Sequence, residues 1–272
     1  MPARTYLMCP PEHFTVSYAI NPWMTTGEPV DSALAMRQWQ ALHDTYVSLG
    51  HRVRLIDPVP GLPDMVFAAN GATVIGGTVL GARFRHPERA AEGPAYLEWF
   101  RASGFRRVHE PEQVNEGEGD ILFTGDVILA GYGFRTDASV KHHLEKIFGV
   151  PVVSLRLTDP RYYHLDTAIA MLSPGTAAYY PGAFDDEGRA ALAGVFTELI
   201  EAKDEDAEVL GLNAVSDGRH VVLPAQAAGL ADRLAAAGYI PVGVDVSEFR
   251  KAGGGPKCCT LELRHEKGEV AS

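Results

Sequence analysis

The chain has 272 residues, 46% apolar and 22% charged, so it can bury a substantial core and is too apolar to be disordered. Its formal charge of −11 argues against a nucleic-acid partner, because phosphate binding requires basic surfaces, and is compatible with a small cationic substrate. No run of about 18 apolar residues predicts a membrane span, and the first residues lack the apolar region of a secretory signal. We expect a cytoplasmic protein with no nucleic-acid or membrane partner; whether it forms a homodimer is left open.

The chain contains three cysteines, Cys9, Cys258 and Cys259. An odd count with two adjacent thiols argues against a disulfide framework, and no pair has the spacing of a structural zinc site. We therefore expect reduced thiols, with no metal and no cofactor.

Periodicity and turn residues predict alternating helices and short strands along the whole chain. The predicted helices cover residues 32–49, 88–103, 140–148, 187–203 and 225–237. The predicted strands cover residues 6–9, 52–56, 66–69, 73–84, 106–109, 120–124, 127–130, 151–155, 167–172, 177–180, 208–212, 214–215, 221–223, 240–244 and 259–264.

This order is strand, strand, helix, strand, repeated five times if the first and last strands of the chain close one unit together. A helix begins about every 40 to 55 residues, a period typical of radial or solenoid folds. We expect one α/β domain over residues 1–272, with an ordinary mixed α/β sheet as the alternative.

Polar side chains recur at the start of each unit's first strand, in steps of about 45 to 52 residues. They are Asp64 with Asn70, Glu116 with Asp120, His164 with Asp166, and Cys258. In a radial fold equivalent loops meet at the axis, so a thiol, an imidazole and several carboxylates would converge, as nucleophilic catalysis requires. Taken singly, each residue also has a plain structural interpretation, as a turn residue, a solvated acidic loop or a packed histidine.

The glycines at residues 253–255 leave room for backbone to approach a ligand beside Cys258, and Lys257 adds a cation next to the thiol. The structural alternative is a glycine turn followed by two buried, unreactive cysteines.

Four motifs together resemble the guanidino-group-modifying enzymes, the amidinotransferase or pentein superfamily. They are DMVFAAN at residues 64–70, EGEGD at 116–120, YHLD at 163–166 and the stretch at 253–260. The resemblance covers nearly the whole chain and implies a five-bladed α/β propeller. Within the superfamily the chain looks like dimethylarginine dimethylaminohydrolases, and most like the arginine dihydrolase domain of cyanobacterial type. The further motifs for that likeness are CPP at 9–11, INPWM at 20–24, GYGFR at 131–135 and residues 251–258.

The resemblance implies a role for each converging residue. Cys258 would attack the guanidinium carbon and form a covalent thiouronium intermediate. His164 would protonate the leaving amine and then activate water, which suits a group that titrates near neutrality. Asp64 and Asp166 would bind the guanidinium by charge-assisted hydrogen bonds, with Glu116 orienting the substrate and His164.

Two assignments stay open. The family's commoner acidic motif is one residue shorter, so Glu118 is an alternative to Glu116. Arg83, Arg89 and Arg135 are candidates for the substrate's α-carboxylate, and the resemblance favours Arg89. Cys259, next along a predicted strand, would point away from the site.

Asn21 and Asn70 match asparagines that the resembling arginine dihydrolases link to a second hydrolysis. We therefore favour arginine dihydrolase, converting arginine to ornithine, ammonia and CO₂. The alternatives are a dimethylarginine dimethylaminohydrolase, an amidinotransferase and, least favoured, a ribosome-binding propeller without activity. A metal-dependent guanidine hydrolase is disfavoured, because no HxxxH or DxHxD spacing occurs.

Overall fold

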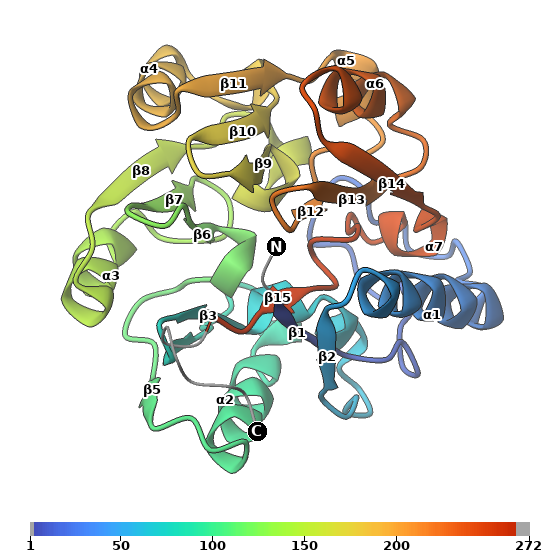
Figure 1. The fold of residues 1–272 in the computed structure, drawn as a ribbon. Helices are drawn as coiled ribbons and strands as arrows, with labels where there is room; N and C mark the ends of the chain where they lie inside the picture. Colours follow the sequence, from blue (N-terminus) through green and yellow to red (C-terminus); the bar gives the residue numbers. More distant parts are fainter. Residues whose placement is uncertain (1–2, 265–272) are drawn as a thin grey trace.

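The computed structural model describes residues 3–264, and the outermost parts of the predicted domain, residues 1–2 and 265–272, lie outside this range. Within it the strands form five three-stranded sheets arranged as a ring (Figure 1). We call each sheet with its crossover segment a blade. Figure 1 shows the first strand of each blade nearest the centre and the helices on the outside.

In blade order, the strands are β15 (Leu261–Glu262), β1 (Thr5–Met8) and β2 (Arg52–Leu55); β3 (Ala72–Ile75), β4 (Thr78–Gly81) and β5 (Arg107–His109); β6 (Ile121–Phe123), β7 (Ile128–Tyr132) and β8 (Val152–Arg156); β9 (Ile169–Ser173), β10 (Thr176–Tyr179) and β11 (Glu198–Glu201); and β12 (Val215–Ser216), β13 (His220–Pro224) and β14 (Ile240–Val244). The helices are α1 (Ser32–Ser48), α2 (Glu92–Ala102), α3 (Val140–Phe148), α4 (Asp186–Val195), α5 (Asp204–Ala207), α6 (Ala228–Ala236) and α7 (Ser247–Arg250).

All five blades of the described chain share one pairing pattern. The first two strands are antiparallel, and the second and third are parallel and joined by a helical crossover. The first blade combines both ends of the chain, because β15 pairs with β1 with Tyr6 opposite Glu262. The predicted five-bladed α/β propeller of ββαβ units, closed by the first and last strands, is confirmed.

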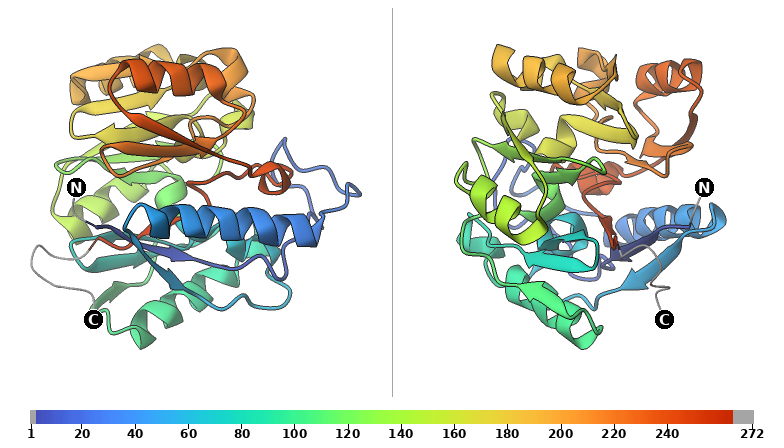
Figure 2. Two further views of the ribbon diagram at one scale, coloured as in Figure 1. Left: turned by 45° about the vertical axis from the view of Figure 1, so that its right-hand side comes forward. Right: turned by 60° about the vertical axis from the view of Figure 1, so that its left-hand side comes forward.

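Local sequence explains where the helices begin and end. Asp31 accepts a hydrogen bond from the backbone of Leu34 and caps α1, and Asp185 caps α4 in the same way through Gly188. Gly149 ends α3 in the left-handed conformation, which costs glycine nothing. Two side views show the helices covering the outer faces of the blades (Figure 2). Their apolar faces pack against sheets whose core side chains are almost fully buried.

Several predicted element boundaries were wrong. The fourth helix ends at Val195, because residues 198–201 form β11 and pair with β10; the strand predicted at 208–212 is therefore absent, and α5 precedes that stretch. Residues 66–69 form 3₁₀ turns instead of a strand. The last strand begins at Leu261 rather than at Cys259.

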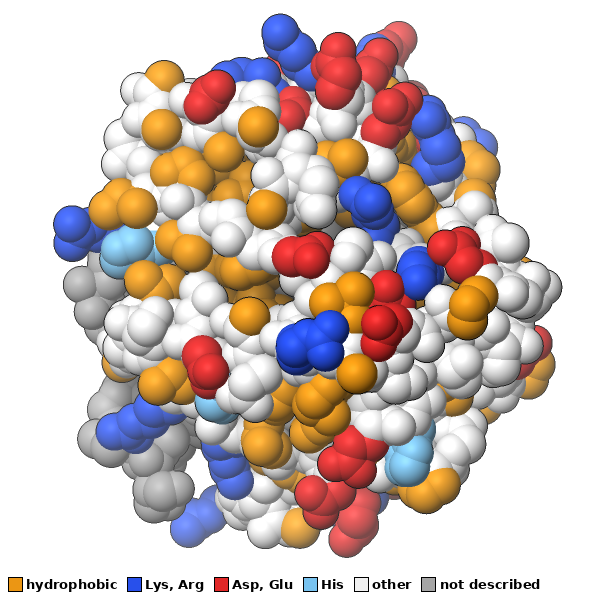
Figure 3. Space-filling model, turned by 90° about the vertical axis from the view of Figure 1, so that its right-hand side faces the viewer, with side chains coloured by type: hydrophobic (Ala, Val, Ile, Leu, Met, Phe, Trp, Pro, Cys, Tyr) orange, Lys and Arg blue, Asp and Glu red, His pale blue; other side chains and the backbone are white. Residues whose placement is uncertain are grey.

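Among residues 3–264, no helix is long and apolar enough to cross a bilayer. In the described range 3–264, four large apolar side chains are exposed: Val47, Leu55, Val59 and Ile240. On the face that carries α1, apolar side chains are interspersed with acidic and basic ones (Figure 3).

Two helical glycines should respond oppositely to substitution by alanine. A Cβ on Gly93, in α2, would lie 2.5 Å from the backbone oxygen of Ala82, whereas one on the exposed Gly194, in α4, would meet nothing within 4 Å. We expect Gly93→Ala to destabilise the fold by about 1–3 kcal/mol through overpacking. Gly194→Ala should stabilise it by about 0.5 kcal/mol by lowering chain entropy in the unfolded state. Urea unfolding of both variants measures the change in the free energy of unfolding. Equal changes would contradict the close approach of α2 to the backbone of Ala82.

Candidate active site

The predicted polar residues lie in turns that precede the first strands of successive blades. In the second blade these are the 3₁₀ turns Pro63–Val66 and Ala68–Gly71, in the third Gly117–Gly119, and in the fourth Leu165–Thr167. Cys258 lies three residues before β15, in the blade that closes the ring. The polar groups therefore occupy equivalent positions in successive blades, each just before the first strand of its blade.

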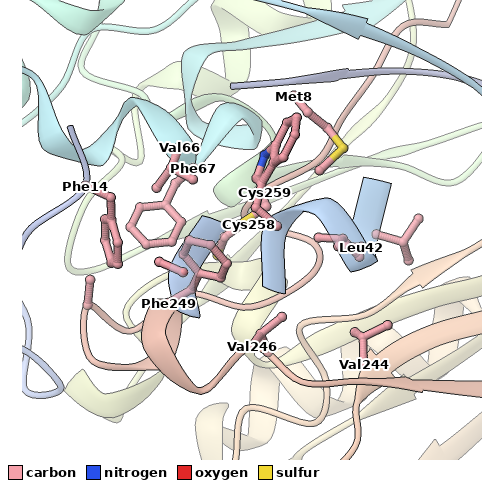
Figure 4. Packing of buried hydrophobic residues seen from close by; sticks show 14 of the residues in the cluster. Met8, Phe14, Leu42, Val66, Phe67, Val244, Val246, Phe249, Cys258 and Cys259 are labelled. Carbon is pink, nitrogen blue, oxygen red and sulfur yellow. The ribbon is translucent and has the colours of Figure 1, made fainter. Parts of the chain in front are cut away.

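Cys258 is 1% exposed, and its sulfur lies between two polar side chains. Asp166 Oδ2 lies 3.5 Å from Sγ, and Asn213 Nδ2 donates to Sγ at 3.1 Å. Asn213 Oδ1 also accepts a hydrogen bond from the backbone N–H of Cys258 at 3.0 Å. The side-chain amide of Asn213 therefore holds both the sulfur and the backbone of Cys258. In Figure 4 Cys258 lies within the packed apolar cluster that contains Phe67 and Phe249.

Asn213 was missed by the sequence analysis, although its position carried a signal. It stands 49 residues after His164 and 45 before Cys258, which is the repeat step. It therefore occupies the place in the fifth blade for which no polar residue had been assigned.

The surroundings of Cys258 oppose its ionisation. Burial, and then the charge of Asp166, raise the pKa of the thiol well above its usual value. Burial likewise raises the pKa of Asp166 to about 7, against the opposing effect of Lys257. A bound cation would lower the pKa of both groups, because it stabilises the thiolate and the carboxylate.

His164 is fully buried and forms a short contact with residues 116–120, which we call the acidic loop. Its Nε2 lies 2.7 Å from Glu116 Oε2, and Arg135 Nη1 donates to the same oxygen at 2.8 Å. Burial opposes ionisation of Glu116, but Arg135 and His164 outweigh it and hold its pKa well below the usual range. Arg135 also lies 4.6 Å above the ring of Tyr163, which fixes the guanidinium in place.

Asp64, Asn70 and Arg89 form a second buried group with Glu92. Arg89 donates to Glu92 Oε1 at 3.0 Å and Oε2 at 2.7 Å, to Asn70 Oδ1 at 2.9 Å and to the backbone oxygen of Asp64 at 3.2 Å. Burial raises the pKa of Asp64, although Arg89 opposes the shift. All three guanidinium nitrogens of Arg89 thus donate within the protein.

Asn70 and His164 each present an unused buried atom to the same place. Within residues 3–264, Asn70 Nδ2 and His164 Nδ1 are buried without a hydrogen-bond partner. A Cβ on Gly119 would lie 2.5 Å from the first and 3.0 Å from the second, so only glycine fits between them. Buried polar atoms normally have partners, so this pair indicates a position for water or a ligand atom.

Asn21 lies in the long loop after β1, against the glycine run. Its Nδ2 donates to the backbone oxygen of Ala252 at 3.0 Å, and its Oδ1 lies 3.0 Å from the position of a Cβ on Gly253. Arg135 donates to the backbone oxygen of Ile20 at 3.0 Å, so the loop is joined to the acidic residues as well.

Two candidates, Glu118 and Arg83, lie elsewhere, and Cys259 differs from the prediction in its local geometry. Glu118 pairs with Lys257 and Arg264 rather than with His164. Arg83 is exposed and donates to the backbone oxygen of Glu112. Cys259 is buried in a helical turn, where its N–H donates to Gly255 O at 3.2 Å, so the predicted strand geometry for the two thiols was wrong.

All three cysteines of the chain are free. In the described part of the chain, no three His, Cys, Asp or Glu side chains are grouped as a metal site would require.

Comparison with known proteins gives concordant matches. Residues 11–265 match the family model "N,N dimethylarginine dimethylhydrolase, eukaryotic". The chain is 53% identical to an N(G),N(G)-dimethylarginine dimethylaminohydrolase of Mycobacterium tuberculosis, over 96% of this chain and 86% of that protein. It is 39% identical to the bifunctional arginine dihydrolase/ornithine cyclodeaminase ArgZ of Synechocystis, over 94% of this chain but only 37% of that longer protein.

Solved structures agree with the fold. The N-terminal domain of ArgZ, an arginine dihydrolase from cyanobacteria solved with bound substrate, superposes with a TM-score of 0.92 at 38% identity, covering 96% of this chain and 98% of that domain. The dimethylarginine dimethylaminohydrolase of Pseudomonas aeruginosa has the same fold, with a TM-score of 0.80 at 22% identity over 96% of this chain and all of that one. The chain therefore belongs to the dimethylarginine dimethylaminohydrolase family of the pentein superfamily, hydrolases that act on the carbon–nitrogen bonds of guanidino groups.

Proposed function

We propose that the chain is an arginine dihydrolase with Cys258 as its nucleophile. The observation that carries the choice is the pair of unused polar atoms, Asn70 Nδ2 and His164 Nδ1, which meet beside Gly119. Removing the guanidino carbon completely requires water to attack that carbon again after citrulline has formed. A donor and an acid–base group at one place could hold that water or the ureido oxygen.

The first half of the reaction forms a bond between sulfur and carbon. The bound guanidinium stabilises the Cys258 thiolate, which attacks the central carbon, while Asp64 and Asp166 hold the cation. His164, oriented by Glu116, protonates the departing nitrogen; the carbon–nitrogen bond breaks and ammonia leaves a thiouronium on the sulfur. Water then attacks this carbon, gives its proton to His164 and releases citrulline as the carbon–sulfur bond breaks.

In the second half the same groups act on the ureido carbon of citrulline. Cys258 attacks the ureido carbon and ammonia leaves with a proton from His164; a second water then replaces the sulfur, and the resulting carbamate loses CO₂ to leave ornithine. We propose that Asn70 and Asn21 hold citrulline for this step. Arg89 was expected to bind the substrate; because its three nitrogens donate to Glu92, Asn70 and Asp64, we propose instead that it orients Asn70 and Asp64 for the substrate.

A second candidate is dimethylarginine dimethylaminohydrolase, which stops at citrulline and releases dimethylamine. The 53% identical relative of that name and the matching family model support it. An amidinotransferase would use the same Cys258 and His164 but pass the carbon to an amine, and turnover without an added amine tests this. The cytoplasmic location remains a prediction from the sequence.

The first prediction concerns the products. Purified protein given arginine alone should form ornithine and ammonia in a ratio of one to two, because arginine contains four nitrogen atoms and ornithine keeps two of them. Asn70→Ala should convert arginine mainly to citrulline, because the second hydrolysis loses its donor. Chromatography of amino acids and an ammonia assay measure both. Citrulline with dimethylamine from dimethylarginine, and no ornithine from arginine, would establish the second candidate instead.

The second prediction separates the adjacent thiols. Cys258→Ser should lower turnover by at least about 10³-fold, because a serine hydroxyl is far less nucleophilic at neutral pH. Cys259→Ser, in the same turn but without contact to Asp166 or Asn213, should keep most of the activity. The reverse result would place the nucleophile one residue later.

The third prediction concerns pH. Since the charge of Asp166 helps to raise the pKa of Cys258, Asp166→Asn should lower that pKa and move the alkylation of Cys258 by iodoacetamide to lower pH. Asn213→Ala removes a donor that favours the thiolate and should move the profile to higher pH. Mass spectrometry of the Cys258 peptide measures the rates. Shifts of the same sign in both variants would contradict this electrostatic account.

A further inference from the structure

Glu118 is a fully paired carboxylate of the acidic loop, yet none of its hydrogen bonds is to His164, Cys258 or Asp166. It is 1% exposed, and all its partners belong to residues 257–264, which we call the nucleophile segment. Oε2 accepts from Lys257 Nζ at 2.9 Å and from the backbone N–H of Glu262 at 3.1 Å, and Oε1 pairs with Arg264. One side chain thus binds both ends of the segment that contains Cys258.

The same loop also holds the segment that carries His164. Glu116 contacts the imidazole directly, and Asp120 Oδ1 accepts the backbone N–H of Leu165 at 3.0 Å. Within five residues, three carboxylates therefore bind the histidine, the backbone after the histidine and the segment of the thiol. The geometry between the two reacting side chains depends on this one turn.

The glycines of the loop fix its own position. Gly117 has a φ of +54°, and a Cβ there would lie 2.6 Å from Ala72 O and 2.7 Å from Ala69 O. A Cβ on Gly119 would overlap Asn70. The loop is packed against backbone on one side and the site on the other, so it is a rigid base for its three carboxylates.

We propose that Glu118 is a positioning residue that holds the nucleophile segment, and with it Cys258, in register with His164. The proposal rests on the proposed function in naming Cys258 as nucleophile and arginine as the substrate whose turnover is measured. It gives the extra residue of the EGEGD motif a role: the loop gains a carboxylate aimed at the last strand while Glu116 keeps its contact with His164.

Glu118→Gln tests this, because the amide keeps the size and an acceptor oxygen but loses the charge that pairs with Lys257 and Arg264. Displacing a reacting atom by about 1 Å can cost on the order of 100-fold in rate. We expect kcat for arginine to fall by about that factor while KM changes little, because the proposed substrate-binding side chains are untouched. Alkylation of Cys258 should become faster, because a loosened segment exposes the buried thiol.

Glu262→Gln is the matched control. Glu262 lies on β15, within the nucleophile segment, and its carboxylate forms ion pairs with Arg4 at 3.0 Å and Arg264 at 2.8 Å. The substitution removes these ion pairs, and the carboxylate makes no contact with the acidic loop. It should lower thermal stability and leave kcat and the alkylation rate of Cys258 within about twofold, as expected for a partly exposed pair. An equal loss of kcat in both variants would mean that turnover depends only on the stability of β15, and not on the contact with Glu118. That result would overturn the proposal.

If Glu118→Gln does not fold, Lys257→Met gives the same test, because Glu118 keeps Arg264 and Glu262. It should lower kcat in the same direction by a smaller factor, and where the double variant folds, the two effects should not add, since both remove one interaction. Unchanged turnover and alkylation in whichever variant folds would refute the inference. A failure of the proposed function would appear differently, as no ornithine from arginine in the unsubstituted protein or as normal turnover in Cys258→Ser, and the alkylation rates would still decide the role of Glu118.

Discussion

The pairing of β15 with β1 is the interaction on which the site depends. It joins residue pairs Tyr6 with Glu262 and Leu7 with Leu261, and the hydrogen bond from Leu263 N to Thr5 O continues it. The pairing closes the ring of blades and places Cys258, three residues earlier, beside Asp166 and Asn213 from the two preceding blades. The short strand β15 thus brings Cys258 to the polar residues of the other blades.

The site is an arrangement of buried charges that compensate one another. Glu116 remains ionised because Arg135 and His164 face it, and Glu92 lies fully buried against Arg89, where burial still raises its pKa to about 7. Asp64, Asp166 and the thiol of Cys258 have less compensation, and their pKa values are raised. These are the groups that a bound guanidinium ion would help to ionise, so they can complement its charge.

Much of this followed from the sequence. The repeat of about 45 to 52 residues gave the ring and four of its five polar positions, because equivalent loops of a radial fold share one end of the axis. Asn213 escaped because an isolated asparagine is usual in a turn, and only its spacing distinguished it. The partners of Glu118 could not be predicted, since they belong to another blade, and those of Arg89 could not because Asn70 and Asp64 lie 19 and 25 positions earlier in the chain. The boundary between α4 and β11 was misjudged because strand pairing, rather than local propensity, ends that helix.

Closure by the first and last strands also has a consequence for how the protein is made. Arg4 and Glu262, neighbours in the folded chain, are separated by 258 positions. During synthesis the inner edge of β1 therefore waits unpaired while four complete blades emerge, and long-range pairing of this kind is slow and exposes an aggregation-prone edge. Because Cys258, the proposed nucleophile, enters with that final strand, a chain truncated before it would lack this thiol, so activity would report that the ring has closed.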